Sequence, residues 1–69
     1  MDMKEKIEKE IVRMKELITD CESVMEEVPK HLRASQELVL ESYKRQLAAL
    51  EQELLELERA QLQNRKFNI

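Results

Sequence analysis

The chain has 69 residues, of which 42% are hydrophobic and 39% charged, with no Gly, one Pro and one Cys. Strong helix formers dominate, while the turn residues and the β-branched or aromatic residues that sheets need are scarce, so an all-α fold is expected. The net charge of −3 gives no electrostatic reason to expect nucleic acid or an anionic membrane as a partner.

The N-terminal part of the chain predicts a helix over residues of about 3–28. Its apolar residues recur at alternating steps of three and four, the heptad spacing of a helix that packs along one seam against another helix. These seam residues are Ile7, Ile11, Met14, Ile18, Cys21, Met25 and Val28. Leu17 and Val24 lie beside the seam and widen the apolar stripe, which suits a helical bundle.

Pro29 predicts the end of this first helix. Proline disfavours helical geometry in the preceding residue and has no backbone donor, so the helix should stop near Val28 and a loop of about 29–34 should follow. Ser35 is then the expected N-cap of a second helix. Pro29 could instead occupy the first helical position and start the second helix earlier, and this alternative stays open.

The C-terminal part predicts a second helix over residues of about 35–64, followed by a frayed tail at 65–69. Its heptad seam consists of Leu40, Tyr43, Leu47, Leu50, Leu54 and Leu57. This seam is offset by one residue from the continuation of the first seam, an offset that a continuous coiled coil does not absorb smoothly. The offset and Pro29 together favour two helices over one.

Folding the second helix back on the first gives an antiparallel coiled-coil hairpin. In the expected register Val28 lies level with Leu40, and Ile11 lies level with Leu57. The flanking charges fit this register in part, since the complementary pairs Glu22–Lys44 and Lys15–Glu51 are accompanied by one like-charge pair, Glu8–Glu58. Parallel dimers through each helix are the competing arrangement, with one favourable and one unfavourable charge pair.

Some apolar residues are not used by the hairpin. Ala48, Leu55 and Leu62 recur every seven residues on the second helix, away from the seam, and Leu17 with Val24 forms a second candidate surface. A repeating exposed stripe on a small chain indicates that another helix packs there. Two interpretations are compatible: a docking face for another protein, and a homodimer that builds a four-helix bundle.

The residues whose side chains could take part in catalysis or metal binding do not indicate an enzyme, a cofactor or a metal site. His31 falls in the expected loop between Lys30 and Arg33, a basic setting that suits neither a metal nor a histidine activated by a carboxylate. Cys21 is a seam residue, where a buried thiol behaves as a small hydrophobe. No catalytic, cofactor-binding or metal-binding residue is therefore expected.

One short motif resembles a known family. The run Ser35-Gln36-Glu37-Leu38 resembles the start of the SQELD signature in the small aspartyl-phosphate phosphatases of the sporulation phosphorelay, which are also helical hairpins. The resemblance implies a phosphorelay regulator. It covers four residues, and Val39 stands where the family has its acidic residue, so no catalytic role is carried over.

The sequence thus predicts a small protein–protein interaction module without catalysis, either an adaptor or an inhibitor. A cytoplasmic location is expected, because the N-terminus lacks the apolar stretch of a signal peptide and no segment is apolar enough to span a bilayer. The alternatives are the phosphorelay regulator and a small dimeric nucleic-acid-binding bundle. A phosphorelay regulator would release phosphate from a phosphorylated receiver domain. A nucleic-acid-binding bundle would be retained on heparin.

Overall fold

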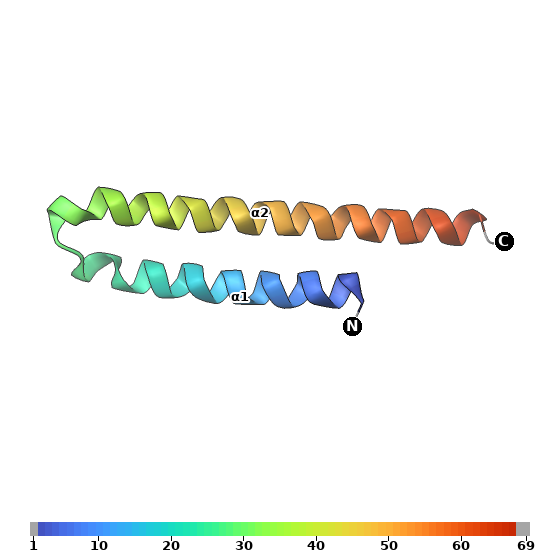
Figure 1. Cartoon of the computed structure of the whole chain (residues 1–69), viewed down its shortest axis with the longest axis horizontal. Coiled ribbons are helices and arrows are strands. Elements are labelled where there is room, and N and C mark those ends of the chain that lie inside the picture. The colour runs from blue at the N-terminus through green and yellow to red at the C-terminus, as the bar shows by residue number, and fades with distance from the viewer. Residues whose placement is uncertain (1, 68–69) are drawn as a thin grey trace.

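The computed structural model describes residues 2–67, and the side chains of residues 2–62. Two α-helices lie side by side and antiparallel: α1 spans Met3–Val24 and α2 spans Lys30–Phe67 (Figure 1). The expected all-α hairpin is confirmed. The molecule is 60 Å long, and the 38 residues of α2 account for this length, because an α-helix rises by about 1.5 Å per residue.

Helix α1 begins with a side-chain cap that the sequence analysis did not identify. The Asp2 carboxylate accepts a hydrogen bond of 2.8 Å from the backbone N–H of Glu5. The Lys6 N–H donates to the Asp2 carbonyl at 3.2 Å. An aspartate at this position satisfies an otherwise unpaired backbone donor and typically contributes about 1 kcal/mol.

The end of α1 follows from Pro29. A short 3-10 helix, η1, continues the first helix over Met25–Glu27, and Val28 is then extended, with φ −74° and ψ 128°. This extended conformation is the one that the residue before a proline prefers. The prediction that the first helix ends before Pro29 is confirmed.

The expected loop and the expected cap at Ser35 are wrong. Helix α2 begins at Lys30, directly after the proline, and the Leu32 N–H donates to the Pro29 carbonyl at 2.9 Å. The open alternative, an early start of the second helix at Pro29, is close to what is observed, since the first helical residue is Lys30, directly after the proline. A proline fits there because its fixed φ is already helical and its missing N–H would have no partner in the first turn.

The core lies along the two predicted seams. The buried hydrophobic side chains among the described residues all belong to α1: Ile7, Ile11, Met14, Ile18 and Cys21. The α2 seam residues are half-buried: Leu40, Tyr43, Leu47, Leu50, Leu54 and Leu57. Arg33 and Gln36 are also half-buried and extend the α2 seam towards the loop. The membership of both seams is confirmed, but α1 alone does not cover the seam of α2.

The register of the two helices differs from the expected one. At the loop, an Arg33 guanidinium nitrogen donates to the Val28 carbonyl at 3.3 Å, so Val28 lies beside the first turn of α2. At the open end, Lys4 and Glu58 line one hollow. The α2 side chains from 59 to 62 are exposed, and α2 projects beyond the N-terminal end of α1 (Figure 1).

These contacts correspond to a shift of one heptad, which brings Ile11 level with Leu50 instead of Leu57. The shift follows from the loop, because a second helix that starts at Lys30 meets the first helix one heptad earlier in its own sequence. Both registers place apolar positions opposite apolar positions, since the pattern repeats every seven residues.

The C-terminal boundary is also later than expected. Helix α2 continues to Phe67, whereas the sequence placed its end near residue 64. The rest of the expected tail, residues 68–69, lies outside the described residues.

Candidate interaction surfaces

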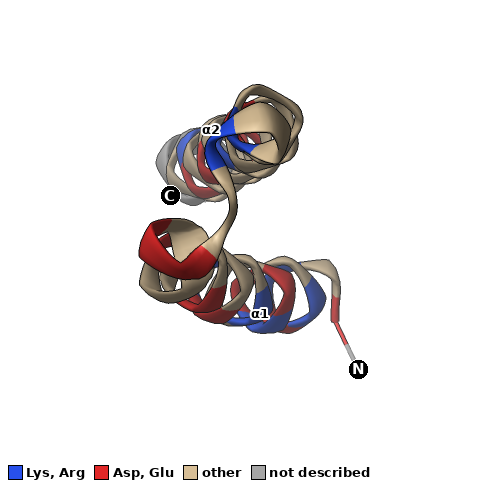
Figure 2. Ribbon diagram, turned by 90° about the vertical axis from the view of Figure 1, so that its left-hand side faces the viewer, with Lys and Arg blue, Asp and Glu red and all other residues tan. Residues whose placement is uncertain are grey.

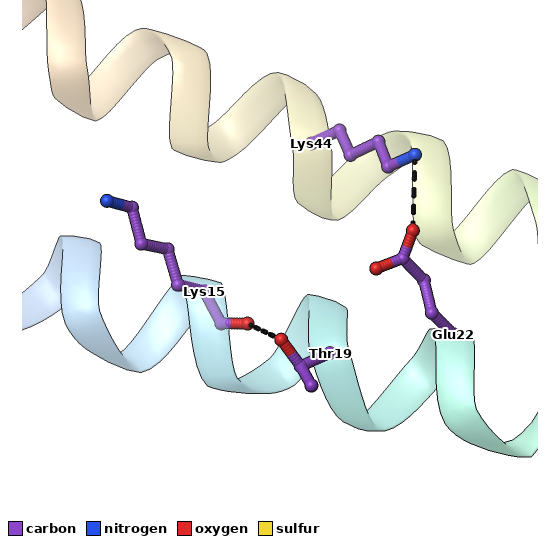
Figure 3. A network of polar contacts seen from close by, with 4 residues as sticks. All are labelled: Lys15, Thr19, Glu22 and Lys44. Atoms are coloured by element: carbon purple, nitrogen blue, oxygen red, sulfur yellow. Dashed lines mark hydrogen bonds and ion pairs between the residues drawn. The ribbon is translucent and has the colours of Figure 1, made fainter.

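One flank of the hairpin carries the predicted ion pair. The Lys44 ammonium lies 3.7 Å from the Glu22 carboxylate, and both side chains are about half exposed (Figure 3). In the same view, the Thr19 hydroxyl donates to the Lys15 carbonyl at 2.9 Å. The Glu22–Lys44 pair is confirmed. An exposed pair of this kind stabilises a fold by roughly 0.2–1 kcal/mol.

The other two charge predictions on this flank are not met. Among the described side chains, no ion pair joins Lys15 to Glu51. Glu58 shares its hollow with Lys4 and not with Glu8, because of the shifted register. The expected like-charge contact between Glu8 and Glu58 is therefore replaced by the proximity of opposite charges.

The opposite flank is apolar near the loop. Leu17 and Val24, the second candidate surface of the sequence analysis, are 37% and 42% exposed. The structure adds Leu32 and Val39 from α2, which are 49% and 40% exposed. We refer to Leu17, Val24, Leu32 and Val39 together as the flank face. It joins residues that are separated along the chain by the turn at Pro29.

Two surface hollows lie along the flank face. A groove of about 300 Å³ between the helices is lined by Met14, Leu17, Tyr43, Gln46 and Leu50, with Glu10 and Arg13 at its edge. A second hollow, of about 490 Å³, lies at the loop and is lined by Val24, Glu27, Val28, Pro29, Leu32, Ser35 and Gln36. Both hollows expose parts of seam residues, so the flank face gives access to the incompletely covered core.

Sequence reasoning did not propose Leu32 and Val39 as surface residues, although a signal for them exists. Continued past Pro29, the heptad period of the first helix falls on Leu32, Ser35, Val39 and Ser42. Because this continued period does not coincide with the α2 seam, it argues against a single continuous helix. In the structure it marks a second line of uncharged residues on α2, beside the seam.

The leftover stripe on α2 is exposed, as the pattern indicated. We refer to Ala48, Leu55 and Leu62 as the outer stripe. Leu55 is 42% exposed and Leu62 is 58% exposed. Leu62 shares a hollow with Lys4 and Glu58, near the point where α2 passes the end of α1.

The residues considered for chemistry are dispersed. Cys21 is 8% exposed and unpaired, while His31 is exposed at the start of α2. No group of three or more His, Cys, Asp or Glu side chains in the described part of the chain could hold a metal ion. Ser35 and Glu37, of the motif that resembles the phosphatase signature, are exposed inside α2.

Charges of both signs alternate along the helices. Figure 2 shows acidic and basic segments interspersed along α1. Within residues 2–67, neither helix contains a stretch of the length and hydropathy needed to cross a bilayer.

The chain was compared with protein-family models, curated proteins and solved structures, and none of them matches it.

Proposed function

We propose that this protein is a non-enzymatic protein–protein interaction module, a small cytoplasmic adaptor or inhibitor that binds other helices through its exposed faces. The hairpin also self-associates into a four-helix bundle. Both statements follow from the mismatch between the apolar residues that the hairpin buries and those that it exposes.

That mismatch is the observation that carries the proposal. Among the described side chains, five hydrophobic residues are buried, whereas nine large hydrophobic residues are exposed. The exposed residues are Met3, Val12, Leu17, Val24, Leu32, Leu38, Val39, Leu55 and Leu62. Single exposed apolar residues are ordinary, but exposed apolar residues that repeat along helix faces are typical of surfaces that bind another helix.

The outer stripe is the proposed docking face for a different protein. It lies on α2, and its last member, Leu62, shares a hollow with Lys4 near the point where α2 projects beyond α1 (Figure 1). Each leucine that such a partner buries contributes roughly 1.5–3 kcal/mol. Burial of the two leucines of the stripe is therefore enough to favour an apolar partner surface over a polar one.

The non-enzymatic role is supported by the positions of Cys21 and His31, the one cysteine and the one histidine of the chain. Cys21 is buried in the seam, and His31 is exposed at the start of α2, between Lys30 and Leu32. Cys21 and His31 therefore do not form a nucleophile–base pair with each other.

Affinity capture from a lysate of the source organism tests this proposal. The variant Leu55→Lys with Leu62→Lys should lose a protein that the wild-type chain retains, because two ammonium groups cannot be buried against an apolar partner. Circular dichroism should show unchanged helicity, since both residues are exposed.

The matched control is Gln52→Lys with Ala60→Lys, which adds the same charge at two exposed positions of the same helix. This control should retain the captured protein. Equal capture by both variants would contradict the assignment of the outer stripe as a docking face.

A further inference from the structure

We infer that a second copy of this chain covers the flank face, with α2 packed antiparallel against α2 of the partner copy around a twofold axis near Val39 and Ser42. This inference rests on the proposed self-association and identifies the face and the orientation that produce it. Four observations support it: an uncharged stripe, its self-complementarity, its flanking residues, and the hollows beside it.

The first observation is that α2 carries an uncharged stripe beside the seam. Its members follow the heptad steps and are Leu32, Ser35, Val39, Ser42, Gln46 and Ala49. The next position, Glu53, is charged. In a chain with 39% charged residues, six successive uncharged positions on one helix face indicate a surface that a partner covers. At about 1.5 Å per residue the stripe is about 27 Å long.

The second observation is that the stripe is complementary to itself when one copy runs antiparallel to the other. Packing around an axis between Val39 and Ser42 places Leu32 opposite Ala49 of the second copy. In the same register Gln46 meets Ser35, and Val39 meets Ser42. Each larger side chain thus faces a smaller one, the alternation that lets two helix surfaces interdigitate. A twofold axis produces every one of these contacts twice.

The third observation concerns the residues that border the stripe. In this register Tyr43 of the second copy lies opposite Leu38, which is 68% exposed, and Arg45 lies two positions further along. The methylene groups of Arg45 can cover an apolar side chain while its charge stays in water. Arg45 already has a carboxylate partner in its own helix, Glu41, at 3.9 Å. The border of the stripe therefore offers an apolar contact without burying a charge.

The fourth observation is the position of the two hollows. Gln46 of the stripe lines the groove that exposes Tyr43 and Leu50, and Ser35 lines the hollow at the loop with Leu32. A helix laid along the stripe therefore also covers the half-buried seam of α2. This explains why α1 leaves that seam incompletely covered: in the dimer, α2 packs against two helices.

The test uses two single-charge variants of the full chain, Val39→Glu and Ser42→Lys. Each variant alone brings like charges together near the twofold axis and should sediment as a monomer at a concentration at which the wild type is a dimer. An equimolar mixture should restore the dimer mass, because Glu at position 39 of one chain then meets Lys at position 42 of the other. Restoration by mixing remains a valid readout even if either variant alone is poorly folded.

The control is Leu55→Glu on the outer stripe, which should remain a dimer. A wild-type chain that is monomeric at every concentration would overturn the inference. So would a mixture that stays monomeric, or a Leu55→Glu variant that dissociates while Val39→Glu does not. Loss of captured protein upon outer-stripe substitution is a separate readout, so the docking proposal and this dimer inference can fail independently.

Discussion

Cys21 illustrates how one residue reports on the packing of a helix. The heptad spacing placed its thiol in the seam, and the structure buries it to 8% exposure. Ser23, two residues further along α1, is exposed. A thiol reagent should therefore modify Cys21 slowly in the folded protein and quickly in denaturant, because the folded state must open before the reagent reaches the sulfur.

The matched control for this prediction moves the thiol to the surface of the same helix. Cys21→Ala with Ser23→Cys should be modified at similar rates in the folded and the unfolded protein. The measurement is the rate of thiol modification, followed by absorbance. Equally fast modification of Cys21 under both conditions would show that it does not lie in the seam.

Arg33 and Gln36 show that the observed register places polar side chains in the seam, which lowers the stability of the fold. Both are polar and both occupy seam positions next to the loop. The Arg33 guanidinium reaches the Val28 carbonyl, but its Nε is buried without a hydrogen-bond partner in the described part of the chain. An unsatisfied buried donor costs about 1–3 kcal/mol. The tight turn is therefore formed at the expense of two polar side chains in the seam.

At the scale of the helices, the central question is which heptad of α2 faces each heptad of α1. Met14 lines a groove with Tyr43, Gln46 and Leu50, the α2 residues on either side of Leu47 in the sequence. The longer loop would instead have placed Met14 level with Leu54. The nearly identical apolar repeat makes these two arrangements similar in packing. The start of α2 directly after Pro29 selects between them.

Paired cysteines distinguish the two registers. In a Cys21→Ala background, oxidation of Met14→Cys with Leu47→Cys should give an intramolecular disulfide, because a disulfide needs Cα atoms about 4.4–6.8 Å apart. Met14→Cys with Leu54→Cys is the matched control and should stay reduced, since one heptad separates the two positions along the helix. Gel mobility before and after reduction measures both. If the second pair forms a disulfide and the first does not, the helices pack in the register expected from the longer loop.

At the scale of the whole molecule, the hairpin is small for an independent fold. Its buried core among the described residues consists of five side chains, all of them on α1. Chains of this size usually need a disulfide, a metal or self-association to be stable. The one cysteine is unpaired, which leaves the proposed dimer as the source of additional burial.

The melting temperature should consequently rise with protein concentration. Because only the folded dimer buries the flank face, mass action favours folding as the concentration increases. Thermal melts followed by circular dichroism over a hundredfold range of concentration measure this. The Val39→Glu variant should melt lower and at a temperature independent of concentration. A wild-type melting temperature that does not change over this range would contradict the dependence of folding on self-association.

The sequence by itself determined the elements and their faces. The heptad steps identified every apolar seam residue from Ile7 to Leu57, and the spacing of Ala48, Leu55 and Leu62 placed the outer stripe correctly on the surface. These features are local, because a helix brings residues three and four positions apart onto one face whatever its partner is. The Glu22–Lys44 pair was also correct, since a lysine side chain is long enough to reach its partner after a shift in register.

Only the tertiary structure decided the register and the composition of the flank face. A repeating pattern is unchanged by a shift of seven residues, so its periodicity contains no information about which heptads meet. That choice depended on the turn, where Pro29 permits a helix to start at Lys30 although Ser35 is a better cap by composition. The start at Lys30 added Leu32 to α2 and brought it next to Val24, and the flank face exists because of that junction.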